Sequence, residues 1–132
     1  MTLDVRRLEK YHPRRSKKEM REHRNKLRTL EDTLTHDMGE LLICAKDGEE
    51  NQFTQASAKT KHDLKSIGPE MQALATEIGA PMPKIVKDYL HNVSILANWQ
   101  DEHRSSPFVK IDDTCIRSCY LSTERLKKTI SK

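Results

Sequence analysis

The chain has 132 residues, of which 33% are charged and 35% hydrophobic, and its net charge is +4. Its four glycines and five prolines are too few for a loop-rich β-sandwich. No apolar run approaches the ~18 residues of a membrane span, so a transmembrane helix is also excluded. Residues 1–28 hold eleven basic and four acidic side chains, so positive charge is concentrated at the N-terminal end. This asymmetry predicts an acidic partner, or else a solvated basic helix face that only aids solubility.

The N-terminal segment is basic and poor in apolar side chains, and Pro13 interrupts it because the residue before a proline avoids helical angles. We therefore expect a basic N-terminal arm over 1–15 and a single helical domain over 16–132. The first helix is expected to begin at a capping box, in which the Ser16 hydroxyl accepts from backbone amides of the first turn and the Glu19 carboxylate accepts from the amide of Ser16.

An apolar stripe with steps of three, four and seven residues predicts that this helix runs to about residue 47, where Gly48 ends it. Its first third is basic and is expected to project beyond the rest. Helix association would bury the stripe, either in a contact with a protein partner or in a dimer of the chain. The stripe consists of Leu27, Leu30, Leu34, Met38 and Leu41.

Two further helices follow in the sequence. Thr54 is the expected N-cap of the second, whose apolar stripe keeps its phase through Gly68 and Pro69, so one kinked helix is favoured over two. Gly79 ends it, and Pro83 fits the first turn of a third helix with an apolar face over 85–97. Ser105–Pro107 are expected to break that helix.

The fourth helix is expected to begin at Asp112 or Asp113 and to carry Cys119, Tyr120 and Leu126. Tyr120, together with Tyr89 and Trp99, is expected to fill the core. Four amphipathic helices joined by short polar loops predict an all-α fold, an antiparallel three- or four-helix bundle with a long first helix.

The sequence carries no complete motif for catalysis or for a cofactor. The glycines are isolated, so the sequence contains no glycine-rich phosphate-binding motif. Asp88–His91 and His36–Glu40 each match only part of a carboxylate metal site. We therefore predict no catalytic residue, no metal site and no cofactor. The odd number of cysteines and the lack of an apolar N-terminal segment predict free thiols and an intracellular location, cytoplasmic or nuclear.

The basic segment remains as the candidate site. It predicts a non-enzymatic helical interaction or regulatory protein that binds an acidic partner. The alternative is a nucleic-acid-binding accessory protein that makes mainly phosphate contacts, and a small metal-dependent or thiol enzyme ranks below both. The predicted contact residues are Arg14, Arg15, Lys17, Lys18, Arg21, Arg24 and Arg28.

Overall fold

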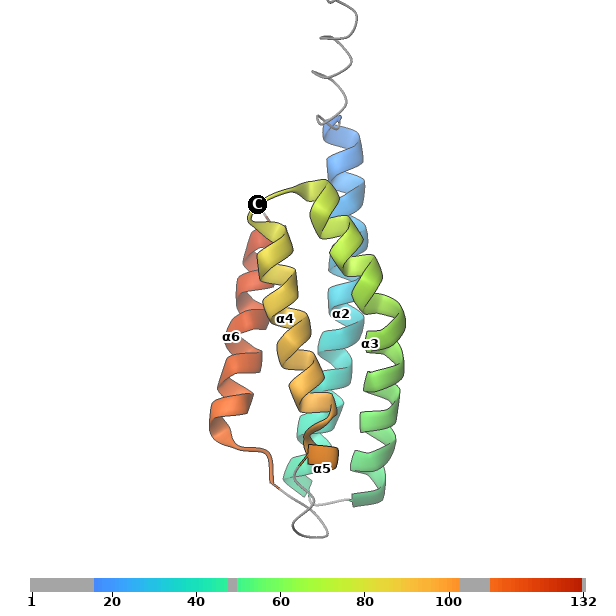
Figure 1. The fold of residues 1–132 in the computed structure, drawn as a ribbon, viewed down its shortest axis with the longest axis vertical. Coiled ribbons are helices and arrows are strands. Elements are labelled where there is room, and N and C mark those ends of the chain that lie inside the picture. The colour runs from blue at the N-terminus through green and yellow to red at the C-terminus, as the bar shows by residue number, and fades with distance from the viewer. Residues whose placement is uncertain (1–15, 48–49, 103–109, 132) are drawn as a thin grey trace, which may run out of the picture.

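The structure is a computed structural model that describes residues 16–47, 50–102 and 110–131. These residues form helices that pack together, with no strand among them, which confirms the all-α fold class (Figure 1). The N-terminal arm over 1–15 and the expected break at Ser105–Pro107 lie outside the described residues. The helices are α2 (Lys17–Asp47), α3 (Glu50–Ile78), α4 (Met82–Ala97), the one-turn α5 (Trp99–Glu102) and α6 (Asp113–Ile130).

Helix α2 begins at the predicted capping box. The backbone amide of Glu19 donates to Ser16 Oγ at 3.0 Å, and the amide of Ser16 donates to Glu19 Oε1 at 3.5 Å. The first turns of α2 extend past the neighbouring helices, as the lack of apolar residues there predicts (Figure 1). The N-terminal part of α2 is therefore placed to carry exposed charge at one end of the molecule.

Helix α3 begins at Glu50, so the prediction that Thr54 caps it was wrong. Phe53 lies in the first turn of this helix and is 1% exposed, packed in the core. The Thr54 hydroxyl instead donates to Gln100 Oε1 of α5 at 3.1 Å. The prediction of one continuous helix is confirmed, because α3 runs through Pro69 to Ile78.

Helix α4 lies at the centre, where it contacts α3, α6 and, less extensively, α2. Its predicted apolar face is almost wholly buried, and Tyr89 is fully so. Trp99 is also buried, but Tyr120 is 64% exposed, so its placement in the core was wrong. The core positions of α6 are Cys119, Thr123, Leu126 and Ile130, and the residue after Cys119 turns away from that face by about 100°.

Gly79 follows the last residue of α3, and its φ of +95° lies in the left-handed region. Its amide donates to the carbonyl of Ala75 at 2.9 Å, as in a helix C-terminal motif. Gly79→Ala is expected to lower the free energy of unfolding by about 1 kcal/mol, since a Cβ disfavours this backbone conformation. Urea unfolding followed by circular dichroism measures the change.

Gly39 supplies the matched control for this prediction. It lies inside α2, and a Cβ built there meets nothing within 4 Å. Gly39→Ala should therefore raise the free energy of unfolding by up to about 1 kcal/mol, because alanine favours the helix. Equal effects of the two substitutions would contradict the conformational argument.

Candidate anion-binding site

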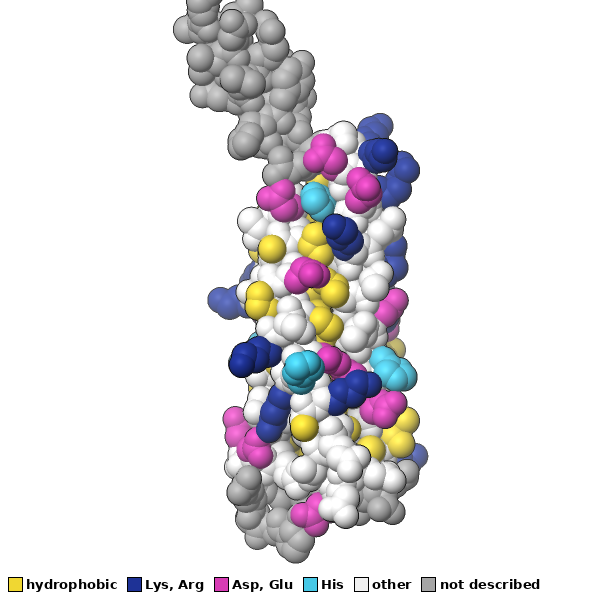
Figure 2. Space-filling model, turned by 90° about the vertical axis from the view of Figure 1, so that its right-hand side faces the viewer, with side chains coloured by type: hydrophobic (Ala, Val, Ile, Leu, Met, Phe, Trp, Pro, Cys, Tyr) yellow, Lys and Arg dark blue, Asp and Glu magenta, His cyan; other side chains and the backbone are white. Residues whose placement is uncertain are grey.

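Four cationic side chains lie on one face of α2, namely Lys17, Arg21, Arg24 and Arg28. Their spacing of four, three and four residues keeps them within about 60° of one another around the helix axis. The same helical geometry places the acidic residues of these turns, Glu19 and Glu22, on the opposite side. Figure 2 shows Lys and Arg side chains gathered along one edge of this end of the molecule.

The C-terminal end of α6 lies against this face of α2. One cleft of about 560 Å³ is lined by the four cations of α2, by Met20, and by Ile130 and Ser131 at the end of α6. A second cleft of about 440 Å³ is lined by Arg24 together with Arg125 and Lys128 of α6. The two clefts share Arg24, so the two helices build one continuous cationic surface.

The lining of both clefts carries charge of one sign. Six cations line them, and no carboxylate belongs to a described residue of either lining. The floor of the second cleft is made of the α3–α4 connection and of Met82 and Ile85 from α4. Unopposed cations at the rim of a low-dielectric wall raise the local concentration of anions. We call these six residues and the two clefts the cationic end.

Arg24 is the residue that joins the two clefts. It is partly buried, and its Nε is a buried donor with no hydrogen-bond partner among the described residues. A buried donor without an acceptor costs about 1–3 kcal/mol. An anion seated in the cleft can supply the missing acceptor once the guanidinium turns towards it.

The cationic end contains most of the predicted contact residues that the structure describes. Lys17, Arg21, Arg24 and Arg28 come together there, whereas Lys18 is exposed and lines neither cleft. Arg14 and Arg15 lie outside the described residues.

Sequence reasoning missed Arg125 and Lys128. The only signal in the sequence was the run of cations in the last turns of the fourth helix, which by itself indicates no more than a favourable interaction with the helix dipole. Their contribution to the site comes from the packing of α6 beside α2.

The predicted association stripe is used inside the molecule. Leu27, Leu34 and Leu41 are fully buried, Met38 is 4% exposed, and Leu30 packs against the same core. The stripe therefore packs α2 against the other helices of its own chain, and of its five residues Leu30 alone keeps partial exposure.

An ion pair between the half-exposed Lys127 and the buried Glu31 joins α6 to α2. Lys127 Nζ lies 3.0 Å and 3.1 Å from the two carboxylate oxygens of Glu31, a residue that is 1% exposed. Burial lowers the pKa of Lys127, but the ion pairs with Glu31 and Asp32 outweigh it and raise that pKa. Because Lys127 lies between Arg125 and Lys128 in the sequence, this contact sets where both cations stand at the cationic end.

Two hydroxyl groups complete the surroundings of Glu31. Thr35 Oγ1 donates to Glu31 Oε2 at 2.5 Å and lies 2.7 Å from the hydroxyl of Tyr89. The Tyr89 hydroxyl also donates to the backbone carbonyl of Glu31 at 3.1 Å. Burial raises the pKa of Tyr89, so its hydroxyl stays protonated and serves as a donor.

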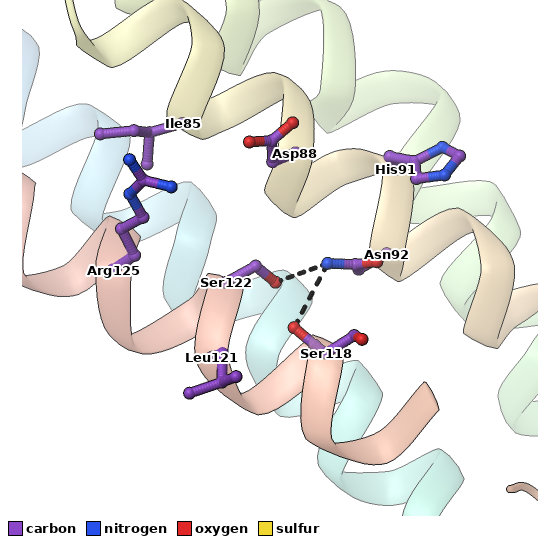
Figure 3. A pocket seen from close by; sticks show the side chains of 8 residues that line it. All are labelled: Ile85, Asp88, His91, Asn92, Ser118, Leu121, Ser122 and Arg125. Carbon is purple, nitrogen blue, oxygen red and sulfur yellow. Dashed lines mark hydrogen bonds between the residues drawn. The ribbon is translucent and has the colours of Figure 1, made fainter. Parts of the chain in front are cut away.

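A third cleft, of about 350 Å³, lies between α4 and α6 and brings serine, histidine and aspartate side chains near one another (Figure 3). The hydrogen bonds in it do not join those groups. Asn92 Nδ2 instead donates to Ser122 Oγ at 3.0 Å and to the carbonyl of Ser118 at 3.3 Å. His91 and Asp88 are both exposed. This arrangement gives neither serine an activating base.

The described residues contain no group of three or more His, Cys, Asp and Glu side chains placed to hold a metal ion. His36 Nε2 and Glu40 Oε1, one of the weak matches in the sequence, lie 3.2 Å apart as an exposed pair. No disulfide joins the cysteines of the described residues, and burial raises the pKa of Cys119 to about 12. No helix formed by the described residues is long and apolar enough to cross a membrane.

These observations define an all-helical protein with a cationic site at one end. Comparison of the chain with protein family models, with curated proteins and with solved structures found no match.

Proposed function

We propose that this chain is a non-enzymatic interaction protein that binds an acidic partner at its cationic end. The observation that carries the proposal is the meeting of α2 and α6, which lines two adjoining clefts with six cations and no described carboxylate. Sequence asymmetry alone permits a solvated helix face as the explanation. Two observations favour a binding site instead. Cations from helices near both ends of the chain lie on one surface, and the buried Nε of Arg24 has no acceptor among the described residues.

The remaining structure is proposed to act as a scaffold. The short connections between α2 and α3 and between α3 and α4 favour an antiparallel four-helix bundle, in which α4 is the central helix. The ion pair between Glu31 and Lys127 holds α6 in place beside α2. Any regulatory role of the protein would depend on the identity of the acidic partner that binds the cationic end.

Removal of three cations from α2 is the first test of this proposal. The triple variant Arg21→Gln, Arg24→Gln and Arg28→Gln is expected to bind an acidic polymer at least about tenfold more weakly than the unaltered chain, because each lost contact removes a charge-assisted hydrogen bond. The probes are polyglutamate and a short DNA duplex of random sequence, measured by fluorescence anisotropy at low salt.

A matched variant removes the same net charge elsewhere. Lys46→Gln, Lys65→Gln and Lys87→Gln change exposed residues that line neither cleft of the cationic end. This control should bind like the unaltered chain. The proposal fails if the unaltered chain binds neither probe, or if the two triple variants lose affinity equally.

A further inference from the structure

We infer that the acidic partner is a nucleic acid, held by its phosphodiester backbone across both clefts of the cationic end. This inference rests on the proposed function and names the class of partner. It is carried by the spacing of the cations, by their chemistry and by what the surface lacks.

The cations of α2 form a row with a regular repeat. With a rise of 1.5 Å per residue, Lys17, Arg21, Arg24 and Arg28 are separated along the axis by about 6, 4.5 and 6 Å, and the row is about 16 Å long. Arg125 and Lys128 continue the surface beyond Arg24. A phosphodiester strand presents one negative charge per nucleotide at a comparable repeat, so several phosphates can be met at once.

The chemistry of the row suits phosphate. Four of the six lining cations are arginines, whose planar guanidinium groups bind phosphate oxygens with two parallel hydrogen bonds. Arg28 has one nitrogen engaged, because Nη1 donates to Asn25 Oδ1 at 3.0 Å, and the rest of its guanidinium fork remains for a ligand. The Nε of Arg24 still requires an acceptor.

The described residues that line the two clefts include no aromatic side chain. A protein interface is anchored by buried aromatic or large apolar side chains, and base recognition in single strands needs aromatic stacking. The exposed large hydrophobic residues of the described chain, Ile43, Tyr120 and Leu121, line neither cleft of the cationic end. The aliphatic residues Met82 and Ile85 in the lining are buried, so the six cations supply the charged contacts, and binding through phosphates should be independent of base sequence.

The test is the salt dependence of binding to a short random-sequence DNA duplex. If all six lining cations meet phosphates, the logarithm of the association constant should fall with the logarithm of the salt concentration with a slope of about −5. Affinity should then drop about 1,000-fold between about 50 mM and about 200 mM salt. A duplex of scrambled sequence should bind with the same affinity and slope.

Single substitutions connect the slope to individual residues. Lys17→Gln, on an exposed residue, and Arg24→Gln should each make the slope less steep by about 0.9 for the duplex, whereas Lys65→Gln should leave it unchanged. Polyglutamate carries carboxylates and should bind more weakly than the duplex at equal salt. A single-stranded DNA of the same length is the second nucleic-acid probe, with a shallower slope per contact.

The outcomes separate this inference from the proposed function. Tight binding of polyglutamate without binding of either DNA overturns the nucleic-acid inference and leaves the acidic-partner proposal standing. A slope near zero, or a slope that Lys17→Gln and Arg24→Gln do not change, also overturns it. Failure to bind any of the probes removes both.

Discussion

Lys127→Met is expected to lower the free energy of unfolding by about 3 kcal/mol, because it leaves the Glu31 carboxylate in the interior without its cation. Glu31 is 1% exposed and Lys127 supplies the only charge within 4 Å that opposes it among the described residues. The Lys127 side chain is 42% exposed, which places the effect at the low end of those seen for buried pairs. Urea unfolding at neutral pH measures the loss.

Two controls isolate the ion pair. Lys128→Met removes a cation from an exposed neighbouring residue and should change stability by less than about 0.5 kcal/mol. The double variant Glu31→Gln with Lys127→Met leaves no buried charge behind and should recover part of the lost stability. If the double variant is as unstable as the sum of the two single variants, the two residues are not coupled and this account of α6 docking is wrong.

Asp37→Asn is expected to stabilise the protein at about pH 7.5 by on the order of 2 kcal/mol and to remove a pH dependence between about pH 4 and about pH 7. Asp37 of α2 is 3% exposed, and its Oδ2 has no hydrogen-bond partner among the described residues. Burial is the largest cause that raises its pKa from 3.8 to about 6, and the nearby carboxyl group of Asp63 on α3 adds to the shift.

The remaining charges near Asp37 act in the opposite direction. Lys59 Nζ lies 3.7 Å from Asp37 Oδ1, and both Lys59 and His36 lower the pKa of Asp37, but less than burial and Asp63 raise it. Because the pKa is higher in the folded chain than in the unfolded one, the folded chain binds the extra proton. The stability from this group is complete below about pH 4 and is lost as the pH rises through about 6.

Urea unfolding of the unaltered chain and of Asp37→Asn at about pH 5 and about pH 7.5 checks the sign. The difference between the two proteins should grow with pH, because only the unaltered chain must hold an ionised carboxylate in the interior. Asp88→Asn, which changes an exposed residue of α4, should follow the unaltered chain at both values. Parallel pH profiles for Asp37→Asn and the unaltered chain would show that Asp37 does not titrate near pH 6.

The helix ends that depend on local chemistry could be read from the sequence. The capping box at Ser16 and Glu19 and the N-cap at Asp112, which accepts from the amide of Thr114 at 2.7 Å, involve residues within three positions of each other. The left-handed Gly79 is equally local. The start of α3 was misjudged because a threonine ahead of an apolar stripe is only a local signal, whereas the helix begins one turn earlier, with Phe53 packed in the core.

The candidate site was only half visible in the sequence. The cations of α2 recur with the helical period, and this period alone places Lys17, Arg21, Arg24 and Arg28 on one face. The sequence also determined the helical class and the buried stripe of α2, since both follow from the spacing of apolar residues along a single helix.

Only the tertiary structure decided which cations meet. Lys127 and Lys128 are adjacent in the sequence, but one is bound to the buried Glu31 and the other lines a cleft beside Arg24. The helical period places Lys127 beside the core face of α6 and Lys128 off it, but the partner of each depends on a helix about 100 residues away in the chain, as in the contact of Lys127 with Glu31. Periodicity fixes the face of each helix, and the packing of α6 against α2 fixes which faces share a surface.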